Sequence, residues 1–298
     1  MMKLIDGKLV AEKIKLELKQ ETLRLVDSGV DPHLAAILVG DDPASQTYVR
    51  NKEKACHEVG IVSSIYRQSA STSEKELLTL IDFINNDPEV HGLIVQLPLP
   101  SHINAANIIQ KVRPEKDVDG FHPVNIGRMV QGLPAYISAT PLGIMKLLEY
   151  YKIQTEGKNC VILGRSNIVG TPLAILMSRK AYPGNATVTI CHSKTQNLEK
   201  IAAQADILIS AIGQPAFVTA DMVKEGAVVI DVGIHRIPSD KTESGYRLIG
   251  DVKFDEVSKK ASMITPVPGG VGPMTIVSLL LNTIKAAKKE IYESVNNR

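Results

Sequence analysis

The chain has 298 residues, of which 44% are hydrophobic, and its formal net charge is +2. The length suits one large domain or two of ordinary size, and the apolar fraction is typical of a globular core rather than a disordered chain. The small net charge, the absence of tryptophan and the presence of only four phenylalanines argue against a dedicated nucleic-acid-binding protein. No apolar run approaches the roughly 20 residues of a transmembrane helix, and charged residues interrupt any signal-peptide core near the N-terminus. We therefore expect a soluble cytoplasmic protein without membrane or nucleic-acid partners.

The first half of the chain alternates strand-like and helix-like patterns. Short apolar runs that end in glycine or proline are typical of buried strands, and stretches that begin with a capping residue and acidic residues are typical of helices. Strands are predicted at 33–40, 61–67 and 91–100. Helices are predicted at 44–59, 73–85 and near 104–112.

The second half repeats this alternation after a connecting helix at 138–151, which has Pro141 near its start. The last segment, 274–295, has a wide apolar stripe and predicts one long helix. Strands are predicted at 159–164, 187–192, 206–213 and 227–233, with helices that start near Pro172 and span 198–205.

Alternation of strands and helices in two series predicts two α/β domains with parallel sheets flanking a cleft. The C-terminal domain is expected to be of the Rossmann type, which binds NAD(P). The expected domains are 1–138 together with 276–298, and 139–275.

The cysteines and histidines indicate neither a disulfide framework nor a metal site. Cys56, Cys160 and Cys191 are odd in number and far apart, so we expect small buried residues in a reducing compartment. The seven histidines are scattered without the spacing of metal ligands.

Residues 164–172, GRSNIVGTP, follow a predicted strand and open a predicted helix. In that position glycines let the backbone approach a phosphate at the helix N-terminus. As a bare pattern the loop is weak, because Ser166 replaces the middle glycine of G-x-G-x-x-G. The alternative is an ordinary tight turn between a strand and a helix.

The second strand of this series ends in CHSKT (191–195), without the acidic residue that usually holds the ribose of NAD. Arg165, Ser193 and Lys194 could hold a 2′-phosphate instead, so the pattern favours NADP. The alternative is that the two cations are solvated surface charges.

Tyr48 and Lys52 lie four residues apart in YVRNK, on one face of a predicted helix. The structural interpretation is a lysine stem that covers a ring at the surface. The chemical interpretation is a lysine that acts as a base beside a phenol.

Two further stretches, KDVDGFHPVN (116–125) and TPVPGGVGPMT (265–275), are dense in proline and glycine. Together with YVRNK, VQLPLP and GRSNIVGTP, they resemble the motifs of the bifunctional methylenetetrahydrofolate dehydrogenase/methenyltetrahydrofolate cyclohydrolases, called FolD in bacteria. The resemblance covers nearly the whole chain, in the family's order. It implies NADP-dependent oxidation of 5,10-methylenetetrahydrofolate and hydrolysis of the product to 10-formyltetrahydrofolate, a homodimer formed through the cofactor domain, and a place in purine biosynthesis.

The resemblance also implies roles for individual residues. Lys52 matches the catalytic lysine, a general base and proton shuttle, and Gln96 would hydrogen-bond it. Tyr48 would stack on the folate, and Asp119 would accept hydrogen bonds from its ring. Further expected folate contacts are Ser45 and the segment from Pro268 through Gly269 to Gly270. Expected NADP contacts are Gly164, Arg165, Ser166, Gly170, Ser193 and Gly213.

The chain departs from the family at 138–141, where Ser-Ala-Thr-Pro replaces the frequent Pro-Cys-Thr-Pro and Ala139 takes the cysteine's place. This departure puts a thiol role there in doubt but leaves the chemistry untouched. We expect Asp117 to hydrogen-bond within its loop, and His122 and His192 have no expected role. A short-chain dehydrogenase also has Tyr-x-x-x-Lys, but there the pair follows the nucleotide loop. The alternatives left open are an enzyme with one activity, a nucleotide-sensing binding protein and a shikimate-type dehydrogenase.

Overall fold

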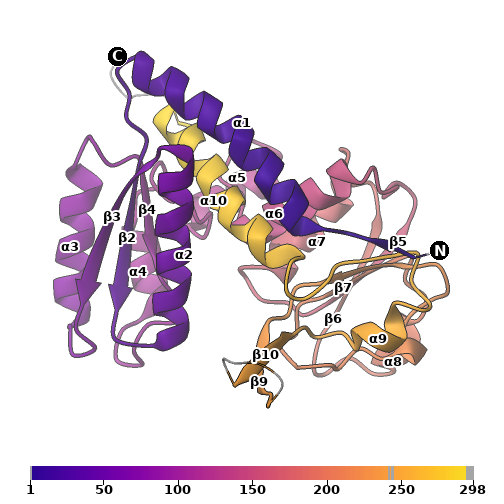
Figure 1. The fold of residues 1–298 in the computed structure, drawn as a ribbon. Helices are drawn as coiled ribbons and strands as arrows, with labels where there is room; N and C mark the ends of the chain where they lie inside the picture. Colours follow the sequence, from indigo (N-terminus) through magenta and orange to yellow (C-terminus); the bar gives the residue numbers. More distant parts are fainter. Residues whose placement is uncertain (1, 241, 243–244, 293–298) are drawn as a thin grey trace. The chain divides into compact units, whose positions relative to one another are not determined.

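A computed structural model describes residues 2–240, 242 and 245–292 (Figure 1). The chain divides into two compact units. The six-stranded unit comprises Met1–Ala11 and Thr140–Thr275, and the three-stranded unit comprises Glu12–Ala139 and Ile276–Arg298. Each unit is described by itself below.

The six-stranded unit is built on a parallel sheet with the order β1-β11-β8-β7-β5-β6. Its interior strands are almost fully buried, because a parallel sheet is covered on both faces. Apolar residues of these strands, such as Val161, Leu208 and Val229, share one core cluster. The strands are β1 (Lys3–Leu4), β5 (Asn159–Leu163), β6 (Thr187–Cys191), β7 (Ile207–Ser210), β8 (Val228–Asp231) and β11 (Met263–Ile264).

Helices connect these strands, and a separate antiparallel hairpin follows β8. The hairpin consists of β9 (His235–Pro238) and β10 (Tyr246–Ile249). The helical elements are α6 (Ala139–Tyr150), α7 (Gly170–Ser178), α8 (Leu198–Ala202), η1 (Ala220–Met222) and α9 (Phe254–Val257).

The three-stranded unit contains a parallel sheet with the order β3-β2-β4. Side chains of the central strand β2 alternate between two cores, as the two-residue period of a strand requires. Leu34 and Ala36 join the cluster that includes residues of α2, while Ala35 and Ile37 join the cluster that includes residues of α3. Figure 1 accordingly shows α2 and α3 on opposite sides of this sheet.

The strands of this unit are β2 (His33–Val39), β3 (Val62–Gln68) and β4 (Gly92–Val95). Its helices are α2 (Pro43–Val59), α3 (Glu74–Asn86), α4 (Ala105–Lys111) and α5 (Pro123–Val130). Helices α1 (Gly7–Asp27) and α10 (Val271–Ala287) each contain a boundary between the units.

The predicted fold class and most predicted elements are confirmed, including the capping box at Ser73. The predicted strand 91–100 was too long, because β4 ends at Val95. Prolines follow at 98 and 100, and proline lacks the N–H that a strand ladder needs. The predicted helix 198–205 is also shorter, ending at Ala202. Helix α1, helix α5 and the hairpin had not been predicted.

The prediction of a final helix over 274–295 was wrong at both ends. Helix α10 begins at Val271 and ends at Ala287, and residues 293–295 lie outside the described residues. Lys289 has φ +56°, and the N–H of Glu290 donates to the carbonyl oxygen of Lys285 at 3.0 Å. A left-handed residue with such a bond terminates a helix.

The N-terminal residues belong to the six-stranded unit, whereas the expected domain boundaries placed them with residues 12–138. Met1–Ala11 group with Thr140–Thr275, because β1 pairs in parallel with β11. The N–H of Ile5 also donates to the carbonyl oxygen of Ile264 at 2.8 Å. The remaining boundaries, at 139/140 and 275/276, lie within a residue of the expected ones.

Candidate functional site

Helix α2 carries three of the expected folate-site residues. Its N-cap is Asp42, whose carboxylate accepts a hydrogen bond from the N–H of Ser45 at 2.7 Å, and Pro43 occupies the first turn. Its C-cap is Gly60 with φ 83°. Ser45 is buried by this capped first turn, so its position is fixed by the same contacts that start the helix.

Lys52 and Gln96 meet inside the three-stranded unit. The Nζ of Lys52 donates to the Oε1 of Gln96 at 3.2 Å. The amide of Gln96 is oriented by a bond from its Nε2 to the carbonyl oxygen of Leu97 at 2.7 Å, which leaves Oε1 for the lysine. Gln96 directly follows β4, at the carboxyl edge of the sheet, where ligand sites of α/β proteins gather. Tyr48 lies one helical turn before Lys52, and 43% of its surface is exposed.

The loop that carries Asp119 is held by Asp117. The carboxylate of Asp117 accepts bonds from the N–H groups of Phe121 and His122 and from the Nδ2 of Asn125, at 3.1, 2.8 and 2.9 Å. Asp117 therefore hydrogen-bonds within the loop, as expected. Burial raises the pKa of Asp117 to about 7, although the three donated bonds act in the opposite direction.

Helix α10 holds the same loop from the other side. The Nδ2 of buried Asn282 donates to the carbonyl oxygens of Val118 and Ile137 at 2.8 and 2.9 Å. Asp119 follows Val118 and borders a cavity of about 20 Å³ whose lining is mostly apolar. Burial raises the pKa of Asp119, and the charge of Lys52 acts against that rise. Lys52 and Gln96 thus form a hydrogen-bonded pair at the carboxyl edge of this sheet, and the charge of Lys52 acts on Asp119.

The glycines of the loop 164–172 are required by close backbone contacts. Gly164 has φ +114°, and a Cβ there would lie 2.3 Å from the carbonyl oxygen of Ala211. A Cβ on Gly170 would lie 2.1 Å from the carbonyl oxygen of Gly164. Both positions therefore exclude side chains and allow the backbone to turn tightly into α7.

The polar side chains of this loop and of the next strand end are exposed. Arg165, Ser166, Ser193 and Lys194 all face solvent, and neither cation is ion-paired with another described residue. Strand β6 ends at Cys191 without an acidic residue after it. Two exposed cations without an acid fit a dinucleotide with a 2′-phosphate better than one with a free ribose hydroxyl.

The loop after β11 packs against the start of α1 within the six-stranded unit. The carbonyl oxygen of Gly269 accepts the N–H of Lys8 at 2.9 Å, and a Cβ on Gly7 would lie 1.8 Å from the carbonyl oxygen of Gly270. Gly269 itself has φ +107°. The start of this loop, with the last residue of β8, most of β10 and the segment that follows β10, lines a cavity of about 510 Å³.

The expected site residues therefore fall into two groups. Lys52, Gln96, Asp119, Ser45 and Tyr48 belong to the three-stranded unit. The other group belongs to the six-stranded unit and comprises Gly164, Arg165, Ser166, Gly170, Ser193, Gly213, Pro268 and Gly269.

Several structurally important polar residues were missed from the sequence. Buried Asp231 and Asp251 form a hydrogen-bonded network with half-buried His235 in the six-stranded unit, and Asn282 supports the Asp119 loop. The sequence contains only weak indications of these roles: Asp231 is an acid near the end of a predicted strand, and Asn282 is an asparagine inside an apolar predicted helix.

Other groups have structural contacts only. His122 caps α5 with its Nδ1, and the Nδ1 of His192 accepts the N–H of Lys194. All three cysteines are free and buried, and burial raises the pKa of Cys56 and Cys160 to about 12.

Among the residues that the structure describes, no helix combines the length and apolarity needed to cross a membrane. Over the same residues, no group of three or more His, Cys, Asp or Glu side chains is arranged to hold a metal ion.

The six-stranded sheet and its glycine loop define a protein with a Rossmann-type dinucleotide-binding unit. A family description, tetrahydrofolate dehydrogenase/cyclohydrolase, NAD(P)-binding domain, matches residues 138–291. The description for the catalytic domain of the same family matches residues 5–119. The chain therefore belongs to the tetrahydrofolate dehydrogenase/cyclohydrolase family, and the resemblance drawn from its motifs is confirmed.

Individual relatives agree with this assignment. The bifunctional protein FolD of Bacteroides fragilis is 58% identical over 293 residues, which are 98% of this chain and 100% of that protein. The structure of the bifunctional FolD dehydrogenase/cyclohydrolase from Campylobacter jejuni is 51% identical, with a TM-score of 0.92, and the match covers 97% of this chain and 100% of that one. The FolD structure from Trypanosoma brucei, complexed with NADP and an inhibitor, is 38% identical, with a TM-score of 0.92 and coverage of 98% and 99%.

Proposed function

We propose that this chain is a bifunctional enzyme of one-carbon folate metabolism. It oxidises 5,10-methylenetetrahydrofolate to 5,10-methenyltetrahydrofolate with NADP⁺ and then hydrolyses the product to 10-formyltetrahydrofolate. The observation that carries this proposal is the contact of 3.2 Å between the Nζ of Lys52 and the Oε1 of Gln96, beside Asp119. Nearly full-length relatives named as bifunctional FolD proteins support it.

The hydrolytic step needs a group that moves a proton at the methenyl carbon. Water adds to this cationic carbon, and Lys52 accepts the proton that the water loses. Gln96 orients the amine, because its own amide is fixed by the carbonyl oxygen of Leu97. The proton then returns to the nitrogen that leaves the carbon. As this carbon–nitrogen bond breaks, the hydroxyl oxygen releases its remaining proton to water and forms the C=O bond of the formyl product.

Substrate binding uses two further side chains of the same unit. Tyr48 stacks its exposed ring on the pterin-like ring of the folate. Asp119 would accept hydrogen bonds from the N–H donors at the edge of that ring; burial raises its pKa, and the charge of Lys52 acts against that rise. Ser45, at the start of the same helix, supports this surface.

The oxidation removes a hydride from the bridging methylene group. When NADP⁺ is bound, its nicotinamide supplies the hydride acceptor. The chain's own contribution is to bind and orient the dinucleotide. Arg165 and Ser193 would hold the 2′-phosphate, and Ser166 and the N-terminus of α7 would hold the other phosphates. Gly164, Gly170 and Gly213 would keep these loops free of side chains.

The substitution Lys52→Met tests this function, because methionine keeps an unbranched stem and removes the amine. Both steps are assayed separately, with 5,10-methylenetetrahydrofolate and with 5,10-methenyltetrahydrofolate. We expect hydrolysis to fall at least about 100-fold, the usual contribution of a positioned acid or base, while NADP⁺ still binds. Lys54→Met is the matched control, because Lys54 lies on the same helix with 77% of its side chain exposed.

Membership of the tetrahydrofolate dehydrogenase/cyclohydrolase family leaves no place for the shikimate-type alternative. The other two alternatives give different results in these assays. An enzyme with a single activity would catalyse only one step in the unsubstituted protein. A nucleotide-sensing binding protein would catalyse neither step but would bind NADP⁺. If Lys52→Met hydrolysed methenyltetrahydrofolate at the unsubstituted rate, the proposed role of Lys52 would be wrong.

We also infer a homodimer that works in the cytoplasm and supplies one-carbon units for purine biosynthesis. Strand β6 supports the dimer, because it is an edge strand of the six-stranded sheet and its Ile190 is 37% exposed. Light scattering after size exclusion measures the mass in solution, and a monomer at micromolar concentration would refute the dimer. A deletion strain tests the metabolic role by its need for added purines.

A further inference from the structure

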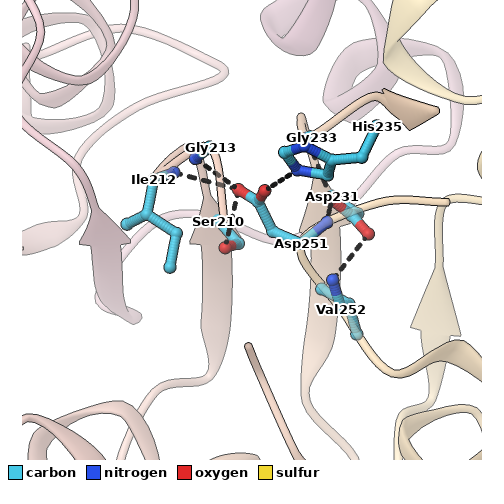
Figure 2. A network of polar contacts seen from close by, with 8 residues as sticks. All are labelled: Ser210, Ile212, Gly213, Asp231, Gly233, His235, Asp251 and Val252. Atoms are coloured by element: carbon cyan, nitrogen blue, oxygen red, sulfur yellow. Dashed lines mark hydrogen bonds and ion pairs between the residues drawn. The ribbon is translucent and has the colours of Figure 1, made fainter. Parts of the chain in front are cut away.

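Two carboxylates, Asp231 and Asp251, are buried side by side in the six-stranded unit (Figure 2). Asp231 is the last residue of β8, and Asp251 lies two residues after β10. Asp231 is 3% exposed and Asp251 is not exposed at all. Buried acids need hydrogen-bond donors, so the groups that they contact show what they hold in place.

The side chain of Asp251 holds the turn that follows β7. Its Oδ2 accepts the N–H of Ile212 at 2.9 Å and the N–H of Gly213 and the hydroxyl of Ser210, both at 3.3 Å. Its Oδ1 lies 2.8 Å from the Nε2 of His235 on the hairpin strand β9. Figure 2 shows this carboxylate between the turn and the histidine.

This turn lies directly behind the phosphate loop. The N–H of Ala211 donates to the carbonyl oxygen of Leu163 at 2.8 Å, and a Cβ on Gly164 would clash with the carbonyl oxygen of Ala211. The turn continues into Gly213, which has φ +69°. A shift of the turn would therefore displace the backbone at Gly164, where the dinucleotide phosphates are expected.

Asp231 in turn fixes the backbone that presents Asp251. Its Oδ1 accepts the N–H of Asp251 at 2.9 Å and that of Gly233 at 3.0 Å, and its Oδ2 accepts the N–H of Val252 at 2.9 Å. A Cβ on Gly250 would lie 1.8 Å from the Oδ2 of Asp231. This close packing fixes the backbone from which the Asp251 side chain reaches the Ile212–Gly213 turn.

We propose that Asp251 is a positioning residue for the dehydrogenase step, which fixes the Ile212–Gly213 turn and, through it, the phosphate loop at Gly164. His235 is its partner and keeps the carboxylate facing the turn. This inference rests on the proposed function and adds to it a residue that does not touch the dinucleotide.

The proposal predicts a selective effect, because Lys52 and Gln96 belong to the other unit. Replacement of Asp251 by alanine removes all four contacts and should raise KM for NADP⁺ about tenfold or more, the scale expected for lost charge-assisted hydrogen bonds. The KM for 5,10-methenyltetrahydrofolate in the hydrolysis assay should stay within about twofold, since no hydrogen bond of that substrate site is removed.

Two conservative variants make the test independent of folding. In Asp251→Asn, the amide oxygen can still accept from the N–H groups of Ile212 and Gly213 while the amide nitrogen donates to His235. The KM for NADP⁺ of this variant should therefore lie much closer to the unsubstituted value than that of Asp251→Ala. In His235→Ala, the carboxylate keeps the turn but loses its second contact, and KM should rise by a smaller factor, about two- to fivefold. The matched control is Asp206→Ala. Asp206 directly precedes β7, at the end of this strand opposite to the Ile212–Gly213 turn, and its carboxylate accepts the N–H of Asn159.

All variants are characterised by both assays, by titration with NADPH and by thermal unfolding. A rise in KM and in the NADPH dissociation constant in Asp251→Ala, with recovery in Asp251→Asn and hydrolysis preserved, supports the proposal. If Asp251→Ala does not fold, a selective rise in His235→Ala carries the same support.

The proposal is overturned if both activities of the Asp251 variants fall in parallel, as a general loss of stability would cause. It is also overturned if His235→Ala and every folded Asp251 variant bind NADPH as tightly as the unsubstituted chain does. Failure of the proposed function is a separate result. In that case the unsubstituted chain would not oxidise 5,10-methylenetetrahydrofolate, while the NADPH titrations would still test the role of Asp251.

Discussion

The contacts of Asn282 lead to a prediction that links the stability of the three-stranded unit to its folate site. Asn282 is 1% exposed, and its Nδ2 donates to the carbonyl oxygens of Val118 and Ile137. We consider Asn282→Leu, which has a similar volume and therefore leaves little cavity.

The magnitude follows from the three polar atoms involved. Two buried carbonyl oxygens lose a donor, at about 1–3 kcal/mol each. The Oδ1 of Asn282 accepts no hydrogen bond from the described residues, so its removal offsets about 1 kcal/mol or more. The net expectation is a loss of about 1–5 kcal/mol in the free energy of unfolding, together with a higher KM for folate because Val118 precedes Asp119.

The assay is urea denaturation followed by far-ultraviolet circular dichroism, which suits a chain without tryptophan. The control is Thr283→Val, because the hydroxyl of Thr283 bonds to the carbonyl oxygen of Leu279 within its own helix. That carbonyl keeps its helical N–H partner, so the control should lose less than about 1 kcal/mol. Equal losses in the two variants, or an unchanged KM for folate in Asn282→Leu, would refute the reasoning.

Three further predictions concern pH, backbone space and cofactor choice. Burial raises the pKa of Asp117 to about 7. Between about pH 4 and pH 7 the folded chain therefore keeps a proton that the unfolded chain has released. The free energy of unfolding falls as the pH rises through this range, by up to about 4 kcal/mol. The urea midpoint of Asp117→Asn minus that of the unsubstituted chain should therefore increase from pH 4 to pH 8. A difference that stays constant would contradict the raised pKa of Asp117. Gly250→Ala should lower the free energy of unfolding by more than about 3 kcal/mol, since its Cβ would overlap Asp231. Gly127 lies on a helix with open space around it, so Gly127→Ala should raise the free energy of unfolding by about 0.5–1 kcal/mol. Similar melting temperatures for the two variants would disprove the clash at Gly250. Arg165→Ser should lower the ratio of kcat/KM for NADP⁺ over NAD⁺ at least about tenfold, and an unchanged ratio would show that Arg165 does not contact the 2′-phosphate.

Much of the architecture could be predicted from local patterns. The period of two in β2, the capping box at Ser73 and the glycine loop at Gly164 act over a few residues, so they are visible in the sequence. The failures also have local reasons. The end of α10 depends on the left-handed conformation of Lys289, a residue type that gives no stop signal.

The candidate site was predicted less completely. Lys52 and Gln96 were named from family motifs, and their contact across 44 residues of sequence is a property of the folded unit. Asp251 and Asn282 had no motif. They became visible because their hydrogen bonds join segments that are distant in the chain, 39 residues apart for Asp251 and Ile212 and 164 for Asn282 and Val118.

The sequence by itself determined the fold class, most elements and the family, because periodicity, caps and motifs are encoded in neighbouring residues. Only the tertiary structure decided which strand pairs with β1, which carboxylates are buried together and which amide holds the Asp119 loop. The physical reason is that burial and long-range hydrogen bonding depend on what the rest of the chain places around a group. The same aspartate is a solvated charge in one fold and a fixed acceptor in another.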